Sequence, residues 1–137
     1  MYRPVILTCS LLLSACASTP VPEHDPQQAW VEMFTRTGKL VMAERLDGKR
    51  LADGRYFQMP PGAHELVVRY DYEIQIPSLV MSQPSERLCY ITLQYDDFKA
   101  GQRYRLEGRN LGLQAGARLF DEQGNKLAED RKVNCLL

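Results

Sequence analysis

Cysteine is the residue type in this chain with the widest range of chemistry. The four cysteines are Cys9, Cys16, Cys89 and Cys135. A thiol can close a disulfide bond, bind a metal ion or take part in redox exchange. Metal and redox sites are disfavoured, because no two cysteines have C-x-x-C spacing and His24 and His64 are the only imidazoles. We therefore expect no metal site and no cofactor.

Residues suited to catalysis are scarce. The sequence contains no G-x-S-x-G, no H-E-x-x-H and no Walker-type loop. Asp96 and Asp97 are adjacent, so in a strand their side chains point to opposite faces and cannot work as a matched acid and base. The sequence predicts a protein that is not an enzyme.

Residues 1–15 have the character of an export signal. Basic Arg3 precedes the apolar run 5–13, and small residues follow. A membrane-spanning helix needs about 20 apolar residues, and polar sequence begins too early for one. The ending Leu13-Ser14-Ala15-Cys16 resembles the lipobox of bacterial lipoproteins. The resemblance implies cleavage before Cys16 and lipidation of its sulfur; the alternative is an ordinary signal peptide with a coincidental cysteine.

The lipobox resemblance also implies a location. In such lipoproteins, aspartate directly after the lipidated cysteine tends to retain the protein in the inner membrane. Here Ala17 and Ser18 follow Cys16. We therefore expect a lipid anchor in the outer membrane, on its periplasmic face.

Residues 16–29 are expected to form the lipidated cysteine and a flexible tether. Three prolines are spaced through polar residues, at Pro20, Pro22 and Pro26. Such segments favour extended conformations of about 3.1 Å per residue, so the tether can hold a domain up to roughly 35 Å from the lipid. His24 is expected to be a solvated tether residue.

The remaining cysteines are Cys89 and Cys135, once Cys9 leaves with the signal and Cys16 carries lipid. Disulfides persist in an oxidising compartment, so we predict a bond between these two. In the chain-entropy model, closing a loop of about 45 residues stabilises the fold by roughly 4 kcal/mol.

Residues 30–137 are enough for a single domain with one core. The full chain has 17 basic and 17 acidic residues and no basic block. This balance does not provide the basic patch that nucleic-acid binding requires, so no nucleic-acid partner is expected.

Alternating hydrophobicity dominates the domain. Residues 64–76, 88–98 and 102–108 each place apolar and polar side chains on opposite faces, the pattern of a half-buried strand. Gly-containing turn dipeptides separate these runs, and helical turns are expected only near 27–34 and 127–131. Residues 77–87 are the longest predicted loop. The sequence predicts an all-β fold, an antiparallel β-sandwich of about seven strands.

Four residues are candidates for a binding surface: Arg69, Arg103, Arg105 and His64. The arginines lie opposite the apolar positions of their strands, so they form either a solvated face or a surface for an anionic ligand or partner. His64 begins a strand, and its imidazole is expected either to pack within the fold or to bind a ligand. Seven aromatic residues are a potential sugar-stacking platform. Because Tyr70, Tyr72 and Tyr95 share register with Leu, Val and Ile, most of the seven are expected in the core. The seven are Tyr56, Phe57, Tyr70, Tyr72, Tyr90, Tyr95 and Tyr104.

Residues 45–72 contain a D-G-K turn, a short strand, P-P-G-x-H and an alternating strand. This order resembles the PEGA-type small β-sandwich repeat. Residues 96–109 and 116–127 are similar to hairpins of uncharacterised Gram-negative envelope lipoproteins. The resemblance implies a non-catalytic role in the cell envelope, although the cysteine pair is not part of the PEGA pattern.

We expect an outer-membrane lipoprotein that binds an envelope protein or supports an envelope assembly, with the lipid anchor as its membrane contact. A carbohydrate- or peptidoglycan-binding module is the alternative, with a glycan as ligand. A third hypothesis is an inhibitor-like protein that inserts loop 77–87 into the cleft of a partner.

Overall fold

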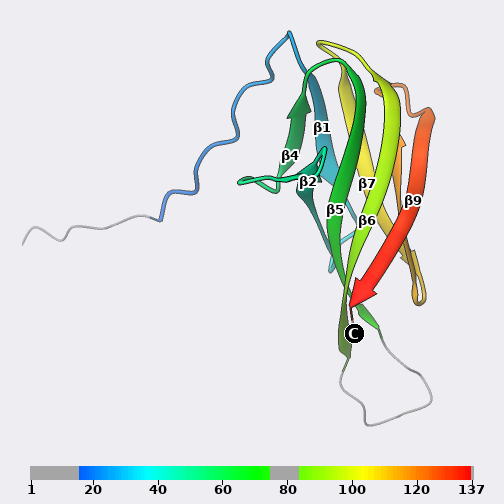
Figure 1. The fold of residues 1–137 in the computed structure, drawn as a ribbon. Helices are drawn as coiled ribbons and strands as arrows, with labels where there is room; N and C mark the ends of the chain where they lie inside the picture. The colour runs from blue at the N-terminus through cyan, green and yellow to red at the C-terminus, as the bar shows by residue number, and fades with distance from the viewer. Residues whose placement is uncertain (1–15, 75–83, 137) are drawn as a thin grey trace, which may run out of the picture.

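The computed structural model describes residues 16–74 and 84–136 of the chain (Figure 1). These residues form strands and no helix, which confirms the all-β prediction. The strands are β1 (Ala29–Phe34), β2 (Leu40–Leu46), β3 (Lys49–Arg50), β4 (Tyr56–Met59), β5 (Gly62–Ile74), β6 (Ser85–Phe98), β7 (Arg103–Leu111), β8 (Gln114–Phe120) and β9 (Lys126–Leu136).

One continuous sheet contains all nine strands, in the order β3-β2-β5-β6-β9-β8-β7-β1-β4. The sequence predicted about seven strands and the structure has nine, of which β1 and β9 lie where helical turns were predicted. The sequence predicted antiparallel strands, and the sheet is mixed because one pair, β1 with β7, is parallel. The other pairs are antiparallel.

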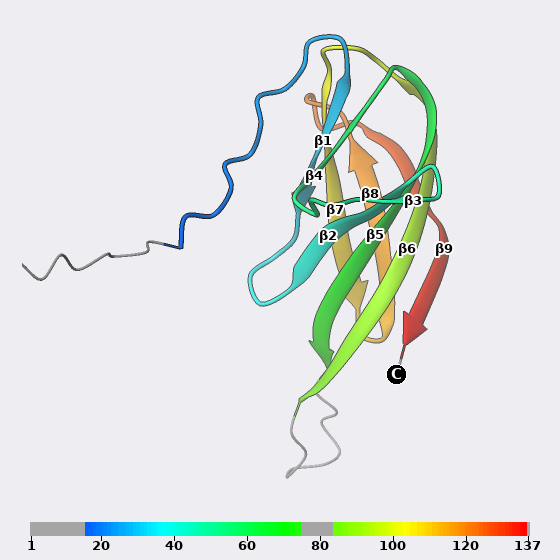
Figure 2. The ribbon, with the colours of Figure 1, turned by 60° about the vertical axis from the view of Figure 1, so that its left-hand side comes forward.

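Strand β9 joins the two halves of the sheet. Its first residues pair with β8, whereas Asp130 and the residues after it pair with β6. The sheet folds over at this strand, so that β2, β5 and β6 lie opposite β1, β7 and β8 (Figure 2). The two layers are therefore parts of a single sheet.

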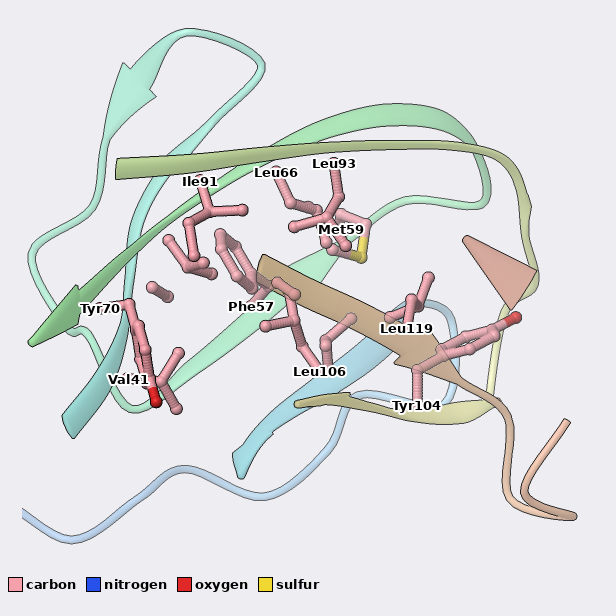
Figure 3. Close-up of a cluster of buried hydrophobic side chains, with 14 of the residues drawn as sticks. Val41, Phe57, Met59, Leu66, Tyr70, Ile91, Leu93, Tyr104, Leu106 and Leu119 are labelled. Atoms are coloured by element: carbon pink, nitrogen blue, oxygen red, sulfur yellow. The ribbon is translucent and has the colours of Figure 1, made fainter. Parts of the chain in front are cut away.

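The hydrophobic core fills the space between the two halves (Figure 3). Tyr70 and Phe57 are the largest fully buried side chains, and no polar or charged residue among those described is buried. The alternation predicted for the long strands is confirmed. The inward positions of β5 are buried from Leu66 to Tyr72, and those of β7 at Tyr104 and Leu106.

Both predicted helical turns are wrong. Residues 29–34 form β1 and residues 126–136 form β9. Part of the predicted loop 77–87 is also strand, because β6 begins at Ser85. Residues 77–83 of that loop lie outside the described residues.

The two ends of the domain differ in their connections. We call the end where β1 begins and β6 leads to β7 the tether end, and the end where β7 leads to β8 and β9 finishes the hairpin end (Figure 1). Gly112, with φ of 56°, allows the tight turn between β7 and β8.

The tether is attached to the domain at several points. Gly101 N–H donates to Gln28 O at 2.9 Å, and Asp25 N–H donates to Gln58 Oε1 at 3.2 Å. His24, predicted to be solvated, lies 2.6 Å from Gln28 O through Nε2 and is half-buried. Further out, Arg55 Nη1 donates to Thr19 O at 2.7 Å. Thr19, Asp25 and Gln28 therefore each contact the folded domain.

Candidate functional site

The four predicted binding residues do not form one site. Arg103 and Arg105 share the outward face of β7, because residues two apart in a strand point the same way. Arg69 belongs to β5 in the opposite half of the sheet, and His64 lies near the start of β5. The structure brings only Arg103 and Arg105 together.

The parallel pairing of β1 with β7 supplies these two arginines with aromatic neighbours. The register sets Trp30 beside Arg103 and Glu32 beside Arg105. The guanidinium carbon of Arg103 lies 5.6 Å from the centre of the Trp30 ring, and that of Arg105 lies 4.9 Å from the Phe34 ring. Both distances are within the range of a cation–π interaction. The arginines are therefore held over aromatic rings on the outer face of the sheet.

A surface hollow of about 440 Å³ lies beside these arginines, and we call it the β7 hollow. Its lining includes two cations, four carboxylates and two aromatic residues. The lining residues are Glu32, Arg103, Tyr104, Arg105, Glu107, Phe120, Asp121, Glu122 and Gly124. A surface of mixed charge suits a polar partner that carries both acidic and basic groups.

Charge pairing in the β7 hollow is loose. Arg105 Nε is 3.6 Å from Glu32 Oε1, and both side chains are more than half exposed. Exposed pairs of this kind contribute little to stability. Hydrogen bonds from the Asn125 side chain and backbone keep the pKa of Asp121 below its usual value, so this carboxylate stays charged near neutral pH. The hollow thus presents ionised groups that a partner can engage.

Trp30 is the main residue of this region that the sequence analysis did not single out. It lies on the outer face of β1 but is only 5% exposed. Tyr56 stacks on it at 4.3 Å with an interplanar angle of 8°, and the His24 ring lies 5.8 Å away. The sequence feature that could have identified Trp30 is that it is the sole tryptophan and follows a polar proline-rich segment. Its neighbours come from β4, β7 and the tether, which local spacing does not reveal.

His64 has a structural position. Its Nδ1 lies 2.6 Å from Asp47 Oδ2 and its Nε2 lies 2.7 Å from Pro60 O. Asp47 also accepts the Glu65 N–H at 2.9 Å. Both ring nitrogens thus face oxygen acceptors, and the side chain links the turn after β2 to the start of β5. These contacts leave no ring nitrogen for a ligand.

Arg69 is engaged on its own strand. Its Nε and Nη2 donate to both oxygens of Asp71, at 2.8 to 3.1 Å. The bidentate bond to Asp71 raises the pKa of the guanidinium further above its usual value. Arg69 therefore has a carboxylate partner already, unlike the loosely paired arginines of β7.

Most of the candidate sugar-stacking aromatics are unavailable. Phe57, Tyr70, Tyr72 and Tyr104 are buried in the core. Tyr95 packs against the core from a half-buried position, and Tyr56 is covered on one face by Trp30. The prediction that most of these rings are internal is confirmed.

The predicted disulfide bond is confirmed, and the lipidation of Cys16 stays a prediction. Cys89 on β6 and Cys135 on β9 occupy directly opposite positions and form a disulfide bond. Cys16 is exposed and has a free thiol. Among residues 16–74 and 84–136, no cluster of three or more His, Cys, Asp or Glu side chains is arranged to hold a metal ion. In the same ranges, no helix is long and apolar enough to cross a membrane.

Comparison with known proteins assigns no family. No family model, no curated protein and no solved structure matches this chain.

Proposed function

We propose that the protein is an outer-membrane lipoprotein that displays its domain on the periplasmic face and binds an envelope protein without catalysing a reaction. The observation that carries this proposal is the combination of two cysteine states in one chain. Cys16 is an exposed thiol before the tether, whereas Cys89 is fully buried in a disulfide with Cys135.

The two cysteine states support export to an oxidising compartment. A disulfide of a small domain is typical of secreted and periplasmic proteins and rare in the cytosol. An exposed cysteine at the start of an extended segment is accessible to a lipid-transferring enzyme. The lipobox-like residues before Cys16 favour this modification over an unmodified thiol.

The β7 hollow supports a protein partner. Arg103 and Arg105 are aligned on aromatic rings, and carboxylates surround them, so the surface offers both signs of charge in a fixed arrangement. Arginine and aromatic side chains are enriched in protein interfaces. A glycan-binding module is the second candidate, but it needs an open aromatic face, and the Trp30 ring lies between Tyr56 and the Arg103 guanidinium.

The anchor is tested by the intact mass of the membrane-extracted protein, with and without reduction. We expect a mature chain that begins at Cys16 and carries acyl chains, and a gain of two hydrogens on reduction. Cys16→Ala removes the acyl mass and is the matched control. An unacylated wild-type protein, or free thiols at Cys89 and Cys135, would contradict the proposed anchor or compartment.

The partner is tested by crosslinking in intact cells with a photoreactive residue at Glu122, at the rim of the hollow. We expect a crosslinked protein band that weakens when Arg103→Gln and Arg105→Gln are combined. Arg69→Gln, on the other half of the sheet, is the control and leaves the band unchanged. Pelleting with purified peptidoglycan that is lost in the double variant, without a protein crosslink, would favour the glycan-binding alternative.

A further inference from the structure

Exposed hydrophobic side chains are concentrated at one end of the domain. The large hydrophobic residues that are exposed, apart from Val21 on the tether, are Phe34, Leu40, Leu111, Leu113 and Leu136. Phe34 ends β1, Leu40 begins β2 and Leu136 ends β9, and these positions all lie toward the hairpin end (Figures 1 and 2). At the tether end, the described strands and turns expose no large hydrophobic side chain.

The tip of the β7–β8 hairpin is the most exposed of these positions. Leu111 and Leu113 flank Gly112 and are 75% and 57% exposed. Turns of this kind usually carry polar residues such as Asn, Asp and Gly. Two leucines on a projecting turn leave apolar surface in water and contribute little to the core. A projecting apolar tip is also suited to insertion into a lipid bilayer.

Basic side chains lie beside the tip. Arg36 and Lys39 from the β1–β2 connection and Arg109 from β7 line a small hollow that also includes Leu111. Glu107 is the one carboxylate of that hollow. A second small hollow that includes Arg109 and Leu111 also contains Arg118, Glu129 and Asp130. Further carboxylates lie toward β5 and β6: Asp71, which pairs with Arg69, and Glu73 and Glu86. The side of Leu111 that faces the β1–β2 connection is therefore cationic, because Arg36, Lys39 and Arg109 outnumber Glu107 there.

The tether points toward this same end. Gln28 N–H donates to Asp25 O at 3.0 Å, which closes a turn before β1. From that turn the chain toward Cys16 runs back in the direction of the hairpin end while moving away from the side of the domain, in both views (Figures 1 and 2). The contact of Thr19 with Arg55 holds this return path. The tether therefore turns back toward the level of the middle of the domain and does not continue beyond the tether end.

We propose that the hairpin end is a docking surface for an anionic phospholipid membrane. Leu111 and Leu113 insert between the headgroups, while Arg36, Lys39 and Arg109 bind lipid phosphates. A membrane accommodates projecting apolar tips, and anionic lipids attract adjacent basic side chains. The inference rests on the proposed lipid anchor, which brings the membrane within reach. It adds that the domain has a fixed orientation on the bilayer, with the tether end pointing away.

The test uses the membrane-extracted, lipidated full-length protein reconstituted into vesicles of phosphatidylcholine and phosphatidylglycerol with brominated acyl chains, which quench tryptophan inside the bilayer. Trp30→Phe removes the sole tryptophan, and Leu113→Trp places a reporter at the tip. Gln123→Trp, at the exposed turn before β9 at the tether end, is the matched control. Preserved strand content and an intact disulfide establish that both variants fold.

We expect quenching at Leu113→Trp to exceed that at Gln123→Trp by at least about threefold. Quenching should weaken when Arg36, Lys39 and Arg109 are replaced together by glutamine, and in vesicles of phosphatidylcholine alone. Equal, low quenching in protein that floats with the vesicles would overturn the docking surface and leave the anchor intact. The docking surface would also be overturned if the tryptophan at the tip were shielded from aqueous quenchers but not quenched by the brominated lipids. That result would mean that another protein or a second copy of this chain covers the tip. Protein that neither floats nor carries acyl mass would refute the anchor, and this inference with it.

Discussion

A Cβ atom on Gly108 would lie 2.9 Å from Cδ2 of Tyr70, closer than side-chain packing permits. Gly108 is in β7 and Tyr70 is in β5, so this contact joins the two halves of the sheet. The Tyr70 ring has little freedom to move away, because its hydroxyl donates to Asn110 Oδ1 at 2.8 Å and the ring is fully buried. The close approach of the two layers therefore depends on a missing side chain at position 108.

Gly108→Ala should destabilise the domain by about 1–3 kcal/mol, because overpacking a filled core forces side chains from their preferred rotamers. The free energy of unfolding in urea measures this loss. Combining it with Tyr70→Leu, which removes the crowding ring, should destabilise the domain by less than the sum of the two single changes. Additive effects would show that the two residues do not compete for the same space.

The sequence predicted the long strands because each has one buried face and one wet face. β5 and β7 follow this rule, and their alternating residues identified both their conformation and the outward position of Arg103 and Arg105. β1 does not follow it. Ala29, Trp30 and Val31 are all buried, because the tether, Tyr56 and Arg103 cover the outer face. Three consecutive buried residues carry no period of two, and the segment was misread as a helical turn.

The charged run in β9 was misread for a related reason. Residues 129–132 are all exposed, since this strand passes from one half of the sheet to the other. The β7 hollow was equally inaccessible to sequence reasoning, because it depends on the parallel pairing of β1 with β7. Those strands are about 70 residues apart, and no local pattern specifies which strand pairs with which.

Asp130 should be important where β9 changes partners. Its Oδ1 accepts the Ala117 N–H at 3.0 Å, in place of a backbone carbonyl. Asp130→Ala leaves that half-buried donor unpaired and should cost about 1–3 kcal/mol of unfolding free energy. Asp130→Asn keeps an oxygen acceptor of the same shape and is the control, with a smaller expected loss. Equal losses in both variants would indicate that the charge, and not the hydrogen bond, matters.

The disulfide should contribute a large part of the stability of the fold. It links positions 46 residues apart on β6 and β9, and such loops correspond to roughly 4 kcal/mol in the chain-entropy model. Replacing Cys89 and Cys135 together with alanine should lower the urea midpoint strongly. Addition of a reductant should then have no further effect. Cys16→Ala should leave the midpoint unchanged, and a similar fall in that variant would argue against this assignment.

The His64–Asp47 contact should make stability depend on pH in the acid range. Burial alone would raise the pKa of Asp47, but hydrogen bonds from His64 and from the Glu65 N–H outweigh it, so the pKa lies below the usual value of an aspartate. A carboxyl group with a lowered pKa in the folded state stabilises the fold fully above its unfolded pKa. That contribution is lost as the pH falls through the lower, folded value.

Asp47→Asn isolates this contribution, because asparagine tolerates the positive φ of 49° at this position but cannot ionise. The wild-type protein should exceed Asp47→Asn in urea midpoint at about pH 6, and the gap should close as the pH falls below 3.8. His64→Ala removes the partner and should reduce the same gap at about pH 6. A gap that stays constant down to acid pH would mean that the carboxylate charge contributes nothing, and that Asp47 acts only through its turn geometry and the Glu65 hydrogen bond.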